Sequence, residues 1–179
     1  INSAIILDFW FKECTPKMWF KKDIEFDKLI KNRFQKTLEY CLENEINKNP
    51  ITKENCLSWI IVLDQFSRNI YRNQIRSFAA DEKALKLSKI SIKKCFLKSK
   101  EDNYNSFFLM PFMHSEKLSD HKFSLPFFKK YTNKKTYDSA KRHKKVIETF
   151  SRFPHRNEIL GRKSTKSELE FLKLPGSKF

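Results

Sequence analysis

The sequence predicts an all-α protein built as a stack of antiparallel helical hairpins. Two glycines among 179 residues leave little material for tight turns. Apolar residues recur at the i, i+3, i+4 and i+7 spacing of amphipathic helices, and no two-residue alternation persists for more than a few positions. Short polar segments link the helical stretches, which favours antiparallel neighbours. We therefore expect one all-helical domain over residues 1–179, a length that suits a single core.

Three long helices are expected in the first half of the chain, over residues 23–41, 52–71 and 81–95. In each of them the apolar side chains fall on one face. Each stretch also begins with a residue that can accept hydrogen bonds from the first backbone amides of a helix, namely Asp23, Thr52 and Asp81. We expect these three side chains to act as N-caps.

Three further helices are expected over residues 104–118, 120–131 and 137–150. The first contains Pro111, which either kinks that helix or opens its second half, because proline removes a backbone donor and clashes with the preceding turn. The third places apolar residues on one face, as a helix packed against a core does.

The end of the chain is expected to hold two short helices. Pro154 should keep the loop before them extended, and Asn157 should restart the helix as its N-cap. This helix should stop at Gly161, which suits the left-handed position after a helix end. Thr165 and Glu168 then have the Thr-x-x-Glu spacing of a capping box for a last helix reaching about residue 172.

The net charge of +16 raises the question of nucleic-acid binding, because basic faces bind phosphate backbones. The lysines, however, are spread over the whole chain, and abundant Lys, Ile and Asn together are typical of codon bias in an AT-rich genome. Specific nucleic-acid binding is therefore not expected. Non-specific binding through the basic charge stays open as an alternative.

The sequence also bounds the location and the cofactors of the protein. The apolar run at residues 4–7 is cut by Asp8 and lacks a basic flank, and no window has the length of a membrane span, so a cytoplasmic protein is expected. Neither a glycine-rich nucleotide loop, a nucleophile elbow nor a His-Glu-x-x-His motif occurs, and no cofactor or metal is expected. Four cysteines without metal-ligand spacing indicate reduced thiols: Cys14, Cys41, Cys56 and Cys95.

Arginine is distributed differently from lysine in this chain. There are 29 lysines but only 8 arginines, and seven of the arginines lie in two short segments, residues 68–76 and 142–162. Arginine offers a planar donor fork that lysine cannot copy. We therefore predict that the two segments need fork geometry and that they meet around one concavity.

The first arginine segment continues a strongly apolar helix. Asp64, Arg68 and Arg72 follow one another at i, i+4 and i+8, which places them along one face. Gln65 and Asn69 add further donors beside this row. Either the row is an exposed ladder of ion pairs, or it is a partly buried network at the edge of the core. We favour the network, in which Asp64 is buried and paired with an arginine.

The four histidines differ in their surroundings. His114 follows apolar residues and stands two positions before Glu116, and His143 shares a face with apolar residues, so both have the surroundings of core histidines. His155 follows a proline in a rigid loop, where side chains often face a cleft. His121 is expected to be a solvent-exposed surface residue.

Several motifs, taken in order, resemble the bacterial domain-of-unknown-function family numbered 924. The resemblance implies an architecture like the superhelix of tetratricopeptide stacks, but no activity. Relative to that family, Ser67 stands where proline is expected, and Lys12, Asn73 and Ser151 stand where glycine is expected. The motifs are Phe9-Trp10-Phe11, Leu63-Asp64-Gln65-Phe66, Arg68-Asn69-Ile70-Tyr71-Arg72, Pro111-Phe112-Met113-His114-Ser115-Glu116, Arg142-His143, Arg152-Phe153-Pro154-His155-Arg156-Asn157, Leu160-Gly161-Arg162, Ser164-Thr165 and Pro175-Gly176-Ser177.

Two functions of different classes fit these residues. The first is a helical scaffold whose groove binds a peptide or a small anionic ligand. Its candidate walls are Asp64, Arg68, Asn69 and Arg72 on one side and His143, Arg152, His155, Arg156 and Asn157 on the other.

The second is a cofactor-independent enzyme that uses the same residues. His114 or His155 would be a general acid or base tuned by Glu116 or Asp64, while arginines hold a phosphate or carboxylate. A long open groove would favour the scaffold, and an enclosed site with converging arginine and histidine would favour catalysis.

Overall fold

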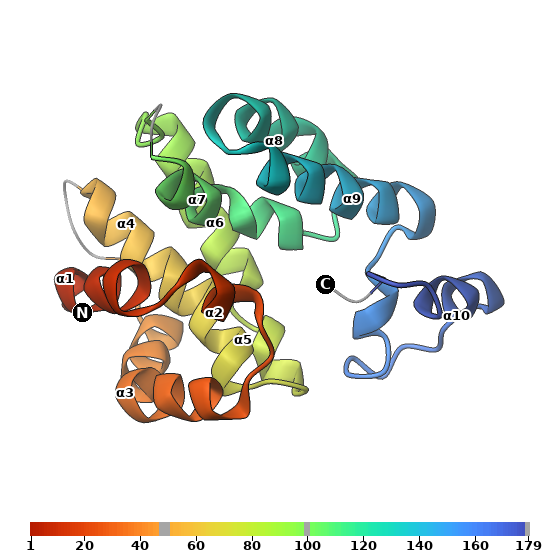
Figure 1. Ribbon diagram of the computed structural model, residues 1–179, viewed down its shortest axis with the longest axis horizontal. Helices are drawn as coiled ribbons and strands as arrows, with labels where there is room; N and C mark the ends of the chain where they lie inside the picture. The colour runs from red at the N-terminus through yellow and green to blue at the C-terminus, as the bar shows by residue number, and fades with distance from the viewer. Residues whose placement is uncertain (47–50, 99–100, 178–179) are drawn as a thin grey trace.

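The computed structural model describes residues 1–46, 51–98 and 101–177, and within these ranges all regular secondary structure is helical (Figure 1). The elements before the middle of the chain are α1 (Ser3–Asp8), η1 (Phe9–Glu13), α2 (Pro16–Phe20), α3 (Ile24–Glu43), α4 (Lys53–Ile60), η2 (Ile61–Phe66), α5 (Ser67–Ile70), η3 (Ile75–Phe78) and α6 (Asp81–Lys93). Those after it are α7 (Asp102–His114), α8 (Leu118–Tyr131), α9 (Lys134–Phe150), η4 (Pro154–Arg156) and α10 (Lys166–Leu172). The all-α prediction is confirmed.

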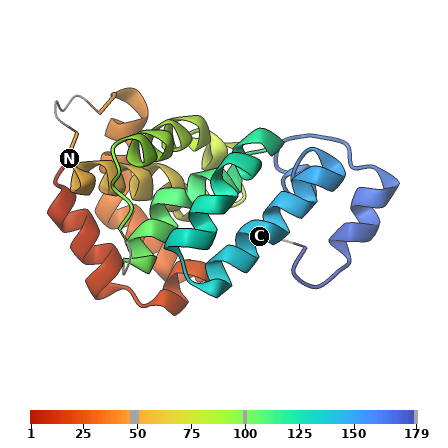
Figure 2. The same ribbon diagram turned by 90° about the horizontal axis from the view of Figure 1, so that it is seen from above.

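Helices adjacent in sequence pack on one another. α3 packs against η2 and α5, α4 against α6, α6 against α7, α7 against α8, and α8 against α9. Figure 2 shows the resulting elongated arrangement, with α1 at one end and α10 at the other. No helix in the described ranges is long and apolar enough to cross a membrane.

The apolar core is unevenly divided along this stack. A large cluster joins α1 to α9 and is rich in aromatic rings, among them Trp10, Phe66 and Phe107. A second and much smaller cluster contains only Val146, Ile147 and Phe153 as fully buried members. The C-terminal segment, residues 151–177, therefore buries few apolar side chains of its own.

Several predicted helix starts are correct, and their caps explain why. Asp23 accepts hydrogen bonds from the backbone of Glu25 and Phe26, and Thr52 accepts one from Asn55. Thr165 and Glu168 form both halves of the predicted capping box. Gly161 has φ of 65°, and the amide of Arg162 donates back to Asn157 O, as expected after a left-handed stop.

Other predicted boundaries are wrong. Asp81 is the first residue of α6 and not its cap, because its carboxylate binds two arginines instead. α7 ends at His114, four residues earlier than expected, and α8 begins at Leu118. Pro154 opens the 3₁₀ turn η4, so Asn157 follows a helical turn and does not cap a new one. α1, η1 and α2 were not predicted, because elements this short do not show a clear apolar periodicity.

The second long helix contains a π-helical turn that its apolar periodicity does not reveal. α4, η2 and α5 follow without a break, and the amide of Ser67 donates to Val62 O, five residues back. All six residues of η2 are buried, including Asp64. The helix ends at Ile70, so Arg72 lies beyond it and leaves the face shared by Asp64 and Arg68.

Two of the positions where the family resemblance implies glycine have left-handed backbones. Asn73 has φ of 62° and Ser151, which ends α9, has φ of 58°. Residues with a Cβ are strained there, although asparagine tolerates the conformation better than serine does. Lys12, by contrast, lies within the helical turn η1, where glycine has no advantage.

We expect Ser151→Gly to raise the free energy of unfolding by about 0.5–1 kcal/mol, because relief of strain exceeds the entropy that glycine adds to the unfolded chain. Lys12→Gly is the matched control and should lower it by about 0.5–1 kcal/mol, because glycine is a poor helix former. Urea unfolding measures both. A loss of stability in Ser151→Gly would contradict the strain assigned to this helix end.

Candidate functional site

The centre of the site is the carboxylate of Asp64, which is completely buried on the π-helical turn. Two side chains hydrogen-bond to it and a third forms an ion pair with it: His114 Nδ1 lies 2.7 Å from Oδ1, Gln65 Nε2 lies 2.6 Å from Oδ2, and Arg68 Nη1 lies 3.1 Å from Oδ1 while donating to Asp64 O. Burial alone would raise the pKa of this carboxyl. The charge of Arg68 and the contacts with His114 and Gln65 have the larger, opposite effect, so the pKa lies well below its usual range. Asp64 is therefore an anion, as the spacing with Arg68 predicted.

The contact with Asp64 fixes the orientation of the His114 imidazole. A carboxylate can only accept, so Nδ1 carries the proton and Nε2 carries a lone pair. Burial and the charge of Arg68 lower the pKa of His114, against the opposing effect of Asp64. Nε2 makes no hydrogen bond to any residue in the described ranges. His114 is thus a neutral imidazole whose proton-accepting atom is not used by any described residue.

The two arginine segments meet at Asp81. Arg68 Nη2 lies 2.9 Å from Asp81 Oδ1, and Arg156 Nη1 lies 3.2 Å from Asp81 Oδ2. One carboxylate therefore binds a guanidinium from each segment, although Arg68 and Arg156 are 88 positions apart in the sequence. Sequence reasoning missed Asp81 in this role, because its position at a helix start had a simpler explanation.

Arg156 is the most enclosed arginine of this centre, with 6% of its surface exposed. Its guanidinium carbon lies 4.6 Å from the ring centre of Phe78 and 4.8 Å from that of Phe153, and Nη2 donates to His114 O at 3.0 Å. Nε is buried and has no hydrogen-bond partner in the part of the chain that the structure describes. Burial and the nearby charge of Arg68 lower the pKa of Arg156 to about 10. A further anion beside Arg156 would offset this lowering of its pKa.

Asn69 and Arg72 belong to a different cluster from Asp64 and Arg68. Arg72 binds Asp27 of α3 with two nitrogens, at 2.5 and 2.7 Å, and Asn69 Nδ2 donates to the same carboxylate at 2.8 Å. The predicted wall is thus divided, because Arg72 follows the end of its helix. These two residues attach α5 to α3.

Arg152 is also placed away from the centre. Its Nε and Nη2 bind the two oxygens of Glu168 at 2.6 and 2.8 Å, and Nη2 donates to Lys163 O. The hydrogen bond from Arg152 and burial of the carboxyl act in opposite directions, and the net pKa of Glu168 is lowered to about 2. This pair holds α10 against the preceding loop.

Glu116, in the loop between α7 and α8, binds the same C-terminal segment. Its carboxylate accepts from Arg162 at 2.7 and 3.0 Å and from the amide of Phe153 at 2.7 Å. Asn157 is buried, accepts from Arg162 Nε at 2.9 Å and donates to Ser164 at 3.0 Å. Glu116 therefore orients a loop and not a histidine.

All four histidines gather around Phe153. Ring centres of His121, His143 and His155 lie 6.3, 5.8 and 5.6 Å from that of Phe153, and His114 lies 6.4 Å from His143. The expectation that His121 is exposed is wrong, since it is buried and Nε2 lies 2.7 Å from Ser115 O. His121 occupies the inward face of α8, which begins earlier than expected.

Burial keeps this cluster uncharged. It lowers the pKa of His143 to about 3, and burial together with the charge of Arg156 lowers that of His155 to about 3. His143 Nδ1 lies 2.8 Å from Ser139 O. Within the described ranges, no group of three or more His, Cys, Asp or Glu side chains is arranged to hold a metal ion.

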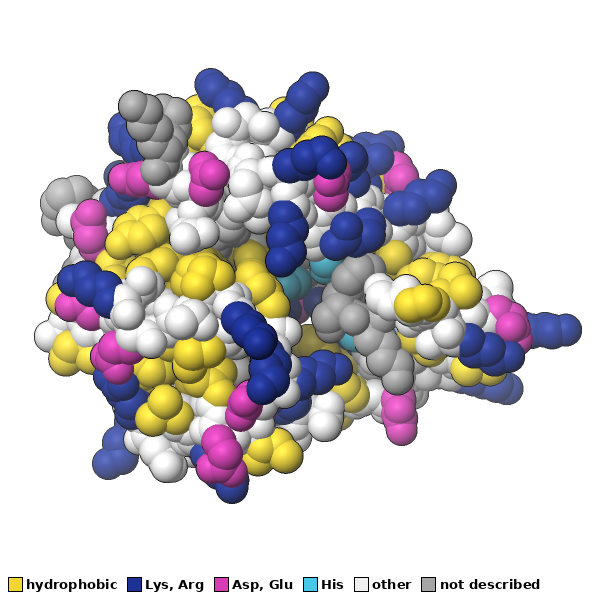
Figure 3. Space-filling view, viewed as in Figure 1, with side chains coloured by type: hydrophobic (Ala, Val, Ile, Leu, Met, Phe, Trp, Pro, Cys, Tyr) yellow, Lys and Arg dark blue, Asp and Glu magenta, His cyan; other side chains and the backbone are white. Residues whose placement is uncertain are grey.

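The face seen in Figure 1 is hollowed between the N-terminal helices and the C-terminal segment. Figure 3 shows histidine side chains on the floor of this hollow and cationic side chains at its edge. His114 and His155 are partly exposed, whereas His121 and His143 are buried. Lys22 lies close enough to lower the pKa of His155.

Comparisons with known proteins agree with the fold and add no activity. A family model described as a bacterial protein of unknown function, DUF924, matches residues 6–176. The solved structure of the protein of unknown function ATU0120 from Agrobacterium tumefaciens is 29% identical, with a TM-score of 0.83 over 96% of both chains. The comparison with curated proteins gave no match.

We expect Asp64→Ala to lower the free energy of unfolding by about 3–5 kcal/mol, because it removes the buried carboxylate that pairs with Arg68 and holds His114, and leaves Arg68 with Asp81 alone. In the double variant with Arg68→Ala the two losses should not add. Glu13→Ala removes the exposed pair with Arg33 and should cost less than about 1 kcal/mol. Urea unfolding of the wild type, of Asp64→Ala, Arg68→Ala and their double variant, and of Glu13→Ala measures these losses. Small, additive losses would show that the Asp64 pair behaves like a surface pair.

The histidine cluster predicts acid sensitivity above the titration range of carboxylates. The unfolded chain binds a proton on His143 near pH 6.5, while the folded protein binds it only near pH 3, so stability must fall as the pH falls between these values. Between pH 7 and 5 this residue alone should remove about 2 kcal/mol. His143→Gln should flatten the slope of unfolding free energy against pH in this window. An unchanged slope would contradict the low pKa of His143.

Proposed function

This chain belongs to the DUF924 family of bacterial proteins of unknown function, and from its site we propose that it binds a small carboxylate or phosphate and exchanges a proton with it through His114. The observation that carries the proposal is the buried Asp64–His114 pair, 2.7 Å apart. A carboxylate that holds Nδ1 leaves Nε2 as a proton acceptor of fixed direction, which is how histidine bases are oriented.

The arginines support an anionic ligand. Arg68 and Arg156 share one carboxylate, Asp81, and the charge of Arg68 lowers the pKa of Arg156. The Nε donor of Arg156 and the Nε2 acceptor of His114 are the polar atoms of this centre that described residues leave unused. A carboxylate or phosphate monoanion next to Arg156 would satisfy the donor and offset the repulsion.

Burial supports a small ligand over an extended peptide. Asp64 and Arg156 are enclosed, and the access to them is at the partly exposed edge of His114. The other arginines of the predicted groove, Arg72 and Arg152, are already bound to Asp27 and Glu168. We therefore assign the ligand contacts to Arg68, His114 and Arg156, so that one small site binds the anion and transfers the proton. We also propose that the protein is cytoplasmic, which its four free cysteines support.

The proposal is tested by following the His114 imidazole in nitrogen NMR spectra while inorganic phosphate or acetate is added. Binding of an anion should raise the pKa of His114, because the imidazolium then faces a negative charge. Arg156→Lys keeps the charge but loses the fork and should weaken binding roughly tenfold or more. Arg33→Lys is the matched control at an exposed pair and should have no effect.

Two outcomes would contradict the proposal. The first is a His114 signal that responds to neither anion at any accessible concentration. The second is an equal response in the Arg156→Lys and Arg33→Lys variants, which would reduce the effect to general screening by salt.

A further inference from the structure

The two polar atoms that described residues leave unused at the His114 site are of opposite kinds. Arg156 Nε is a donor, which is buried and has no hydrogen-bond partner among the described residues. His114 Nε2 is an acceptor, because the Asp64 carboxylate can only accept and therefore holds the imidazole proton on Nδ1, 2.7 Å away. A ligand that satisfies both atoms must accept one hydrogen bond and donate another.

Both atoms belong to one small centre. Arg156 Nη2 donates to the backbone oxygen of His114 at 3.0 Å, which joins the guanidinium to the residue that carries the imidazole. Arg68 acts on both groups, since its charge lowers the pKa of His114 and that of Arg156. The two requirements therefore fall on the same ligand.

The donor for His114 Nε2 has to come from the ligand itself. A plain carboxylate could bond to Nε2 only after a proton from solvent had turned the imidazole into an imidazolium. Burial and the charge of Arg68 oppose that step, because they lower the pKa of His114. A ligand with its own proton meets the neutral imidazole without adding a positive charge next to Arg68.

We propose, on the basis of the anion binding proposed above, that the ligand of this site carries an O–H group beside its negative charge, as a 2-hydroxy carboxylate or a hydrogen phosphate does. The anionic oxygen accepts from Arg156, and the O–H donates to His114 Nε2. Sites that bond a ligand hydroxyl reject analogues without it, because a polar group of the protein is then left unpaired.

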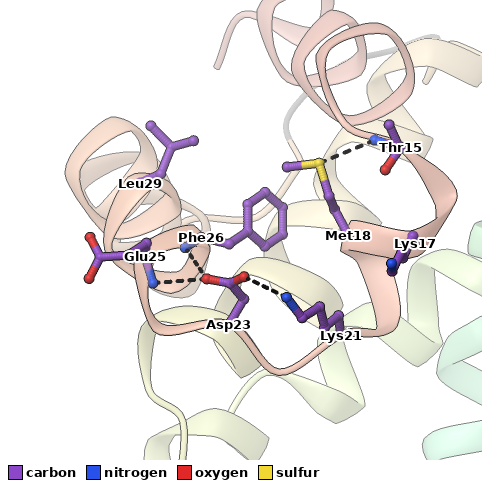
Figure 4. Close-up of a pocket in the computed structure, with 8 residues that line it drawn as sticks. All are labelled: Thr15, Lys17, Met18, Lys21, Asp23, Glu25, Phe26 and Leu29. Atoms are coloured by element: carbon purple, nitrogen blue, oxygen red, sulfur yellow. Dashed lines mark hydrogen bonds and ion pairs between the residues drawn. The ribbon is translucent and has the colours of Figure 1, made fainter.

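A second hollow, between α2 and α3, provides a comparison (Figure 4). The ring of Phe26 and the thioether of Met18 give it apolar walls, and Asp23 is engaged by Lys21 and by two backbone amides. Lys17 also lines this hollow. Lysine ammoniums only donate hydrogen bonds, so an anion held there by Lys17 would gain nothing from an O–H group.

Isothermal titration of the whole protein with matched anions tests this class of ligand. Glycolate differs from acetate by one hydroxyl, and phosphate near neutral pH keeps an O–H that sulfate, of similar shape, lacks. Glycolate and phosphate should bind about tenfold or more tightly than acetate and sulfate, because the latter leave Nε2 unpaired. The glycolate pair decides if the two pairs disagree, since its members have the same charge.

Two variants locate the contact. His114→Ala should remove the preference for glycolate, and Lys17→Ala, the control in the second hollow, should keep it. Thermal unfolding checks that both variants are folded. In the wild type, nitrogen NMR reports on the same contact directly, because Nε2 should shift as it accepts a hydrogen bond from glycolate and should shift less with acetate.

Equal binding of glycolate and acetate would overturn this inference and leave anion binding intact, because that binding needs only the arginine donors. A preference that persists in folded His114→Ala would overturn it as well, since the hydroxyl would then meet another acceptor. Failure of all four anions to bind would contradict the proposed function itself. If His114→Ala does not fold, the wild-type affinities and the Nε2 signal decide.

Discussion

The fold depends on one carboxylate that two guanidiniums share. Asp81 lies at the start of α6, within the large core, and binds Arg68 from the same core and Arg156 from the C-terminal segment. With Asp64 and His114 added, two cations and two anions form a neutral, largely enclosed network. Charges can be kept in such surroundings only when each has partners of opposite sign and good hydrogen bonds.

The contrast between arginine and lysine has a structural explanation. Six of the eight arginines bind a carboxylate of a described residue, and in Arg33, Arg72, Arg152 and Arg162 two guanidinium nitrogens contact the same acid. Lysine has one compact ammonium and cannot form this planar arrangement. The lysines, which lie mainly on the surface, need only charge. Arginine therefore stands chiefly where two segments of chain are joined. Among the described residues, the buried guanidinium nitrogen without a hydrogen-bond partner is Arg156 Nε, in the Arg68–Arg156 centre.

The sequence revealed the local part of this arrangement and not its long-range part. Apolar periodicity located α3, and the i, i+4 spacing correctly paired Asp64 with Arg68, because both are properties of a single helix. The distribution of arginine further predicted that two distant segments meet. The acidic partners Asp27 and Asp81 could not be found, because many acids were equally available and only the packing of α3 and α6 selects these two. The burial of His121 was missed for the same reason.

The attachment of residues 151–177 also has a consequence for motion. Few apolar side chains hold this segment, and two ion pairs, Arg156–Asp81 and Arg162–Glu116, join it to the rest of the chain. Segments with little apolar burial open locally at a lower free energy than the whole protein unfolds. Backbone amides here should therefore exchange their hydrogens earlier than those of α4 or α7. Each such opening would separate Arg156 from the carbonyl of His114. The buried centre is therefore covered by a segment that opens at a lower free energy than the whole protein unfolds.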